Sequence, residues 1–222
     1  MMAGNSRSIA SAQSGPHRDL EKRLRRHLAQ PFRKPLLDVN RAAAQAALAA
    51  HAAWNRQAPL ILDAGCGVGW STARLAAAYP DHFVLGVDQS RHRLERGKPL
   101  PLPPNALLLR ADLVDFWRLL AANGVRLAHH YLLYPNPWPK IGHLARRWQG
   151  HAVFPVWRDL GGVVECRSNW RVYIEEMALA LGWLSGQPVA VEPWRTADPL
   201  TPFEKKYLAS GHSLWRCRVH LG

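Results

Sequence analysis

A glycine-rich turn with an aspartate in front of it is the strongest candidate for a ligand site in this chain. Asp63 directly precedes a turn with glycines at alternate positions, Gly65, Gly67 and Gly69. Glycines allow a tight turn and let a ligand approach the backbone closely. The spacing is not the Gly-x-Gly-x-x-Gly of dinucleotide sites, and Asp63 would repel a pyrophosphate. Its carboxylate suits a cationic amino group, so we expect an adenosine-type cofactor that carries one.

Two further aspartates follow the next two apolar segments. Asp88 ends the run Phe83–Val87, where an acid can accept hydrogen bonds from both ribose hydroxyls of an adenosine. Its alternative use is as a helix N-cap. Asp112 would face the adenine amino group, whereas Asp115 is the more natural N-cap of the helix that follows.

Apolar runs alternate with helical patterns between Leu60 and Leu184. The expected strands are Leu60–Leu62, Phe83–Val87, Asn105–Leu109, His129–Tyr134, Val163–Cys166, Val189–Val191 and Leu214–Val219. The expected helices are Arg41–Trp54, Ser71–Ala78, Asp115–Asn123 and Tyr173–Leu184. This alternation predicts an α/β fold with a parallel, doubly wound sheet and helices on both faces. The last two strands, with no predicted helix between them, indicate an antiparallel pair at one edge.

Such a sheet would bring the three aspartates together. In open α/β sheets, ligands bind outside the carboxyl ends of the strands. Asp63, Asp88 and Asp112 each follow one of three consecutive strands. We therefore expect them to form one cofactor site.

The first 40 residues form a basic extension to a single domain over residues 41–222. Residues 1–15 are rich in Ser, Ala and Gly without a period, so we expect them to be disordered. The segment His17–Leu28 places three leucines on one helical face and basic residues on the rest. It predicts a short amphipathic helix, which is either docked by its leucines with its charges in solvent or directly involved in binding a partner.

The charge balance favours a polyanionic partner. The 222 residues include 29 Lys and Arg against 16 Asp and Glu, a net charge of +13. Such a surplus is typical of proteins that meet nucleic acid or an anionic membrane surface. The apolar stretches are too short or too interrupted to span a bilayer, and the three cysteines lack the spacing of a metal site. We expect a cytoplasmic protein with no membrane association and no metal.

The segment Tyr134–Lys140, which reads Tyr-Pro-Asn-Pro-Trp-Pro-Lys, follows the fourth expected strand. Prolines on both sides of Asn136 fix the local backbone and remove donors, which suits a catalytic position. Downstream comes a basic and aromatic cluster made of His143, Arg146, Arg147 and Trp148. This cluster suits phosphates and stacked bases, although a solvated basic loop is the alternative.

On these segments the chain resembles the tRNA (guanine-N7)-methyltransferase family, one of the Rossmann-like S-adenosylmethionine-dependent methyltransferases. The family carries Pro-Asp-Pro-Trp-x-Lys followed by His and Arg-Arg, then Thr-Asp-Trp, then Thr-x-Phe-Glu. This chain has Ser168-Asn169-Trp170 and Thr201-Pro202-Phe203-Glu204 at the last two. The segments occur in the same order over roughly Leu60–Val219.

The resemblance implies a seven-stranded sheet that closes with an antiparallel edge strand. It implies S-adenosylmethionine as cofactor and structured RNA, above all tRNA, as substrate. The cofactor-binding residues would then be Asp63, Gly65, Gly67, Asp88, Asp112 and Asn136. The substrate-binding residues would be Lys140, Arg146, Arg147, Asn169, Thr201 and Glu204.

Asn136 and Asn169 stand where the family has aspartates, and Asn136 holds the catalytic position. Guanine N7 bears a lone pair and no proton, so its methylation needs no general base. The product ring is cationic, and a carboxylate stabilises that charge better than an amide does. Losing one such electrostatic contact costs on the order of 100-fold in rate.

Two other functions stay open on this pattern. Asn136-Pro137-Trp138 is similar to the Asn-Pro-Pro-aromatic motif of amino-methyltransferases, in which an amide oxygen accepts a hydrogen bond from an exocyclic amine. Such an enzyme would act on RNA, DNA or protein. The other alternative is a catalytically weakened paralogue that binds RNA.

Overall fold

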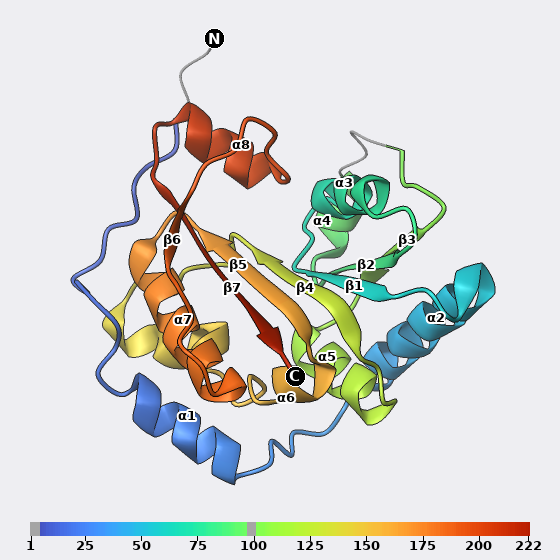
Figure 1. Cartoon of the computed structure of the whole chain (residues 1–222), viewed down its shortest axis with the longest axis horizontal. Coiled ribbons are helices and arrows are strands. Elements are labelled where there is room, and N and C mark those ends of the chain that lie inside the picture. The colour runs from blue at the N-terminus through green and yellow to red at the C-terminus, as the bar shows by residue number, and fades with distance from the viewer. Residues whose placement is uncertain (1–4, 97–100) are drawn as a thin grey trace.

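The structure, a computed structural model, describes residues 5–96 and 101–222. Within them, the strands are β1 (Leu60–Ala64), β2 (Phe83–Asp88), β3 (Ala106–Arg110), β4 (Leu127–Leu133), β5 (Gly162–Ser168), β6 (Glu192–Trp194) and β7 (Leu214–Leu221). They form one seven-stranded sheet in the order β3-β2-β1-β4-β5-β7-β6 (Figure 1). The first five strands are parallel, and β7 runs antiparallel to both β5 and β6. The predicted doubly wound sheet with an antiparallel edge is confirmed.

Helices cover both faces of the sheet. The described helices are α1 (Leu20–Ala29), α2 (Asp38–Asn55), α3 (Trp70–Ala78), α4 (Arg91–Arg96), α5 (Leu113–Ala122), α6 (Val156–Leu160), α7 (Arg171–Ser185) and α8 (Pro202–Ala209), with 3-10 turns η1 (Ile141–Arg146) and η2 (Trp148–Gly150). Leu60 and Leu62 of β1 join the larger core with α2, α5, α6 and α7. Ile61, between them, points to the opposite face and packs with Leu75 of α3. This alternation is the side-chain period of a strand.

The segment between the last two strands differs from the prediction. We expected a loop there, but it contains α8, which begins with Thr201 as N-cap and Pro202 in its first turn. Both are helix-start signals that the surrounding prolines obscure. The sixth strand is Glu192–Trp194 rather than Val189–Val191, and it contains Pro193. Proline is tolerated there because β6 is the edge strand.

The N-terminal segment also differs from the expectation of disorder, from residue 5 onward; residues 1–4 lie outside the described part. Its backbone and side chains make hydrogen bonds to the domain at Ser6, Ser11 and Gln13. Figure 1 shows this segment in blue, running from beside α8 to α1. The predicted amphipathic helix is present as α1, with Leu20 and Leu24 buried.

None of the described helices is both long enough and apolar enough to span a bilayer.

Candidate active site

The glycine turn between β1 and α3 keeps an open space above its backbone. Gly65, Gly67 and Gly69 have φ of 79°, 60° and 78°, a region that other residues rarely adopt. Chain neighbours aside, no heavy atom of the described residues lies within 4 Å of a Cβ built on Gly65 or Gly67, whereas one on Gly69 would lie 2.6 Å from Leu108 Cδ1. The first two glycines therefore leave room for a ligand, and the third allows close packing of α3 against β3.

Asp63 lies buried behind this turn, at the carboxyl end of β1. Its Oδ2 accepts hydrogen bonds from Ser71 Oγ at 2.6 Å and Thr72 Oγ1 at 2.7 Å. Burial raises the pKa of Asp63 to about 6, although the two hydroxyl donors act in the opposite direction. We did not identify these two hydroxyls from the sequence. They lie in the first turn of α3, directly after the glycine turn, and this position in the sequence could have indicated them.

Asp88 ties the end of β2 to the glycine turn. Gly67 donates its backbone N–H to Asp88 Oδ2 at 3.0 Å, and Ser90 donates to Oδ1 at 2.8 Å. Arg93 lies 3.7 Å from the same carboxylate. The side chain of Asp88 is therefore fixed beside the glycine turn.

The helix N-cap that we expected at Asp115 is instead Asp112. Asp112 is the N-cap of α5 and accepts a hydrogen bond from Val114 N at 2.9 Å. The prediction that Asp115 is the N-cap is wrong, because Asp115 is buried and accepts hydrogen bonds from Leu37 N and Asn40 Nδ2. The half-exposed Asp112 still lies at the shared edge, since Ala111 N donates to the carbonyl of Asp88.

The loop Tyr134–Lys140 after β4 has an unusual backbone. Tyr134 and Trp138 have φ of 53° and 46°, and they are the non-glycine residues with positive φ in the described chain. Such conformations persist only where the surroundings enforce them, and they cluster at functional sites. Asn136 between them is exposed, and its Oδ1 accepts a hydrogen bond from Trp138 N at 3.4 Å.

A buried carboxylate holds the start of this loop. Tyr134 donates its hydroxyl to Glu204 Oε1 at 2.6 Å, and its backbone N–H to the carbonyl of Arg167. Glu204 also accepts from Arg167 Nη1 at 3.1 Å and Trp194 Nε1 at 2.8 Å. Burial and the Glu204 charge raise the pKa of the Tyr134 hydroxyl well above its ordinary value, so it remains a donor.

Thr201 and Glu204 were predicted to bind the substrate, but both lie inside the protein. Glu204 is fully buried, and Thr201 is nearly so, with its hydroxyl accepting from Glu204 N at 2.9 Å. The pair caps α8 and anchors the loop. A Thr-x-x-Glu segment is a helix-start signature, so the sequence could have indicated that this pair caps a helix.

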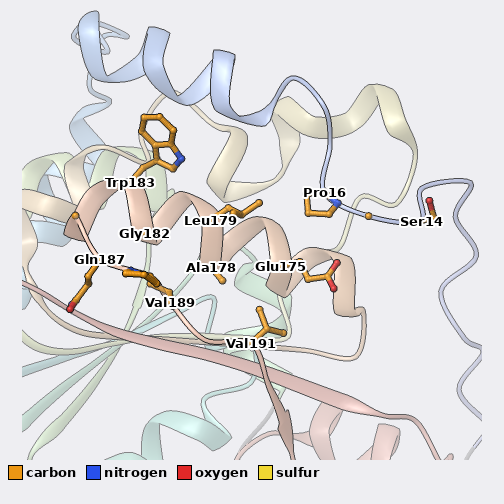
Figure 2. Close-up of a pocket in the computed structure, with 13 residues that line it drawn as sticks. Ser14, Pro16, Glu175, Ala178, Leu179, Gly182, Trp183, Gln187, Val189 and Val191 are labelled. Atoms are coloured by element: carbon orange, nitrogen blue, oxygen red, sulfur yellow. The ribbon is translucent and has the colours of Figure 1, made fainter.

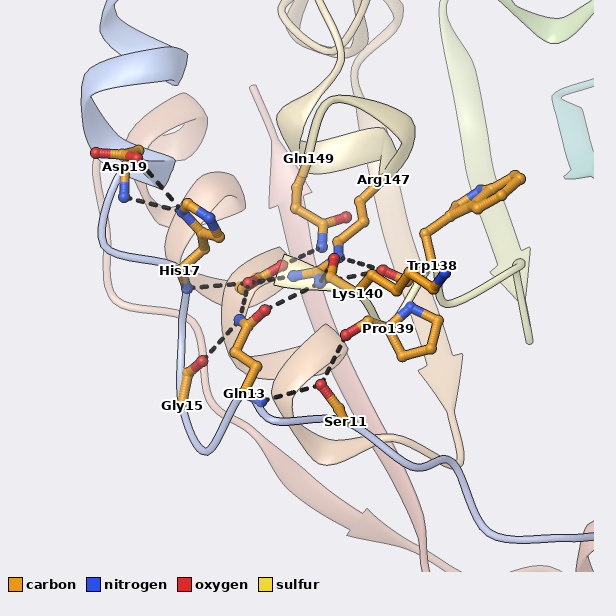
Figure 3. A network of polar contacts seen from close by, with 11 residues as sticks. Ser11, Gln13, Gly15, His17, Asp19, Trp138, Pro139, Lys140, Arg147 and Gln149 are labelled. Carbon is orange, nitrogen blue, oxygen red and sulfur yellow. Dashed lines mark hydrogen bonds and ion pairs between the residues drawn. The ribbon is translucent and has the colours of Figure 1, made fainter. Parts of the chain in front are cut away.

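The basic cluster divides into exposed and buried members. Lys140 and Arg146 are exposed, and the guanidinium of Arg146 lies over the Trp138 ring at 4.8 Å. Arg147 is fully buried and forms an ion pair with Glu176 at 2.6 Å (Figure 3). The prediction that Arg147 contacts RNA is thus corrected: its charge is used inside the protein.

Asn169 lies half-buried after β5, and its side-chain nitrogen is 3.1 Å from His212 Nδ1. The His212 ring stacks on Tyr207 of α8, with ring centroids 5.3 Å apart. This places Asn169 beside α8 and the N-terminal segment, because His212 also contacts the carbonyl of Ser6.

A shallow groove of about 970 Å³ lies along α7 (Figure 2). Its walls include Leu179, Trp183 and Val189. The groove shares no residue with the glycine turn or with the loop after β4, so it is separate from the candidate active site. Among the described residues, no cluster of His, Cys, Asp and Glu could hold a metal ion.

The chain is similar to known methyltransferases. A family model described as "Putative methyltransferase" matches residues 57–217. The tRNA (guanine-N(7)-)-methyltransferase of Paracidovorax citrulli is 34% identical over 185 residues, covering 76% of this chain and 71% of that protein. The protein of the same name from Bordetella pertussis is 33% identical over 181 residues, covering 74% and 68%.

Solved structures show the same fold. A variant 16S rRNA (adenine(1408)-N(1))-methyltransferase from Catenulisporales acidiphilia, with cosubstrate SAM, has a TM-score of 0.54 and 20% identity over 80% of this chain and 91% of that one. The 16S rRNA methyltransferase KamB has a TM-score of 0.52 and 18% identity, covering 86% and 97%.

The fold and the glycine turn therefore define a Rossmann-like methyltransferase. More closely, the chain belongs to the tRNA (guanine-N7)-methyltransferase family, which confirms the resemblance found in its motifs.

The anchoring role of Glu204 predicts a large loss of stability on its removal. Glu204→Ala leaves Arg167 buried without its partner in α8, and it frees the Tyr134 hydroxyl. We expect the free energy of unfolding to fall by about 3–5 kcal/mol, measured by urea denaturation. The matched control is Glu192→Ala, which breaks an exposed ion pair with Arg216 and should cost less than about 1 kcal/mol. Equal losses in the two variants would contradict the anchoring role.

The raised pKa of Asp63 predicts a pH-dependent effect of Asp63→Asn. The folded carboxyl protonates near pH 6 against an ordinary value of 3.8, so the folded protein binds more protons between these values. The contribution of Asp63 to the free energy of unfolding therefore falls as the pH rises from 3.8 to about 6. Asparagine has no charge to bury, so the Tm of the variant should gain on that of the parent across this range.

Thermal unfolding at several pH values measures this difference. The exposed Asp159→Asn serves as a control for removing a carboxylate. If the Tm difference between Asp63→Asn and the parent stays constant with pH, the pKa of Asp63 is not raised in the folded protein.

Proposed function

We propose that this protein transfers the methyl group of S-adenosylmethionine to N7 of a guanine in tRNA. The observation that carries the proposal is the position of Asn136. It is exposed on a strained loop after β4, on the sheet edge that also carries Asp63 and Asp88. The names of the relatives support the choice of guanine N7 as the base atom and of tRNA as the substrate.

The residues of the glycine turn fit the proposed cofactor. Gly65 and Gly67 leave open space above the backbone, and Asp88 is fixed beside them. Asp88 would bind the ribose hydroxyls, Asp112 the adenine amino group and Asp63 the amino group of the methionine part. Bound there, the cofactor supplies an electrophilic methyl group on a sulfonium.

Asn136 would face the guanine and also contact the cofactor. Because N7 has no proton to lose, this residue need only orient the base and stabilise the positive charge that develops on the ring. An amide oxygen does this by its dipole, which is weaker than the full charge of a carboxylate. The proposed site therefore depends on orientation more than on proton transfer.

The exposed charges beside Asn136 would bind the RNA backbone. Lys140 and Arg146 are exposed in this region, and Trp138 is half-exposed under the Arg146 guanidinium. Cations bind phosphates without regard to sequence, and an aromatic ring can stack on a base. Asn169, at the neighbouring strand end, would complete the base pocket.

Transfer of labelled methyl groups to bulk tRNA, followed by mass spectrometry of the nucleosides, tests the proposal. We expect 7-methylguanosine as the product. An exocyclic N-methyl product would instead support an amino-methyltransferase. Binding of tRNA without any methylated nucleoside would overturn the enzymatic proposal.

Restoring the family's carboxylate tests the role of Asn136. Asn136→Asp keeps the acceptor that bonds Trp138 N and adds a negative charge near the developing cation. We expect kcat for methyl transfer to be maintained or to rise, by as much as about 100-fold. Asn136→Ala, which lacks the acceptor, should lower it. Loss of activity in Asn136→Asp would contradict N7 chemistry, because a carboxylate would harm only a reaction that needs the amide.

A further inference from the structure

The N-terminal segment crosses the back of the candidate active-site loop. Ser6 binds Ser210 at the end of α8, and Ser11 donates its hydroxyl to the carbonyl of Pro139 at 2.7 Å. Gln13 then reaches the buried pair Arg147–Glu176 (Figure 3). The segment therefore joins α8, the loop after β4 and α7.

Gln13 completes the coordination of this buried ion pair. Its Nε2 donates to Glu176 Oε1 at 2.6 Å, and its Oε1 accepts from Arg147 Nη2 at 2.9 Å. The backbone N–H of His17 adds a third donor to the same carboxylate oxygen, at 3.0 Å. Both charges are fully buried, so each needs every available partner to offset its loss of hydration.

Arg147 passes this constraint to the loop. Its Nε donates to the carbonyl of Trp138 at 3.2 Å, and its Nη2 donates to the same carbonyl at 3.1 Å and to that of Lys140 at 3.4 Å. Trp138 is the residue with positive φ that follows Asn136 by two positions. Pro137 and Pro139 have no N–H to donate, so the loop is held mainly through its carbonyls.

One face of the loop is thus fixed by side chains from residues 11–13. Ser11 holds the carbonyl of Pro139, and Gln13 orients the guanidinium that holds the carbonyls on either side of it. Ser11 and Gln13 are only partly buried, and they belong to a segment without secondary structure. Neither residue belongs to the hydrophobic core, so substituting it leaves the apolar packing unchanged.

We propose that Ser11 and Gln13 are positioning residues, which set the loop so that Asn136 faces the base in the orientation for methyl transfer. The inference rests on the proposed function for its catalytic part. Its structural part, the order of the loop, does not depend on any substrate.

Three full-length variants test the proposal. Gln13→Met keeps the size of the side chain and removes its hydrogen bonds. Ser11→Ala removes the hydroxyl, and Ser11→Thr restores one. The matched control is Ser14→Ala, which changes an exposed serine of the same segment.

Kinetics with tRNA provide the first measurement. We expect Gln13→Met and Ser11→Ala each to lower kcat roughly tenfold, as for the loss of a hydrogen bond that holds a reacting group. Lys140 and Arg146 keep their charges and their exposure, so the KM for tRNA should change less than kcat. The dissociation constant of S-adenosylmethionine should stay close to that of the parent, because the glycine turn and Asp88 are untouched. Ser11→Thr and Ser14→Ala should keep the parent kcat.

Hydrogen–deuterium exchange without RNA provides the second measurement. We expect residues 138–147 to exchange faster in Gln13→Met and Ser11→Ala, while residues 60–88 exchange as in the parent. Faster exchange in the two variants, together with a parent protein that methylates no RNA, would support the loop coupling and reject the proposed function. Unchanged exchange and unchanged kcat, or a lower Tm with unchanged kcat, would overturn the positioning role.

Discussion

Two buried ion pairs hold the loop after β4 in a conformation that its own backbone disfavours. Arg167 and Glu204 fix Tyr134 at the start of the loop, and Arg147, paired with Glu176, fixes the carbonyl of Trp138. Residues with positive φ cost of order 1–3 kcal/mol each, so they need such support. The candidate active site depends on these charges although none of them faces the solvent.

The glycine turn proposed for the cofactor is built in the opposite way, because its conformation needs no buried charges to hold it. It forms from glycines that accept positive φ without support, and one backbone N–H, that of Gly67, binds Asp88. The contacts of Asp63 with Ser71 and Thr72 are local, eight and nine residues apart. The glycine turn proposed for the cofactor therefore needs little from the rest of the chain, whereas the loop proposed to meet the substrate needs α7, α8 and the N-terminal segment.

This difference explains how much the sequence could predict. Apolar periodicity and turn chemistry act over short separations. From them we could predict the sheet, its antiparallel edge and the aspartates beside the glycine turn. The roles of Arg147 and Glu204 did not follow, because their ionic partners Glu176 and Arg167 lie 29 and 37 residues away. A charged residue is expected at the surface unless it is paired, and sequence alone does not show the pairing.

Asn136 stands at the position proposed for catalysis, and its own contact within the loop is local. Asn136 accepts the N–H of Trp138 through its side-chain oxygen, as a carboxylate would in the same turn. The supports of the loop contact Tyr134, Trp138 and Lys140, and they do not depend on the charge at position 136. Under the proposed function, asparagine at position 136 thus retains the geometry of the loop and stabilises a cationic ring less than a carboxylate would. Whatever rate this chain attains must come mainly from orientation, which is the contribution that the buried charges behind the loop secure.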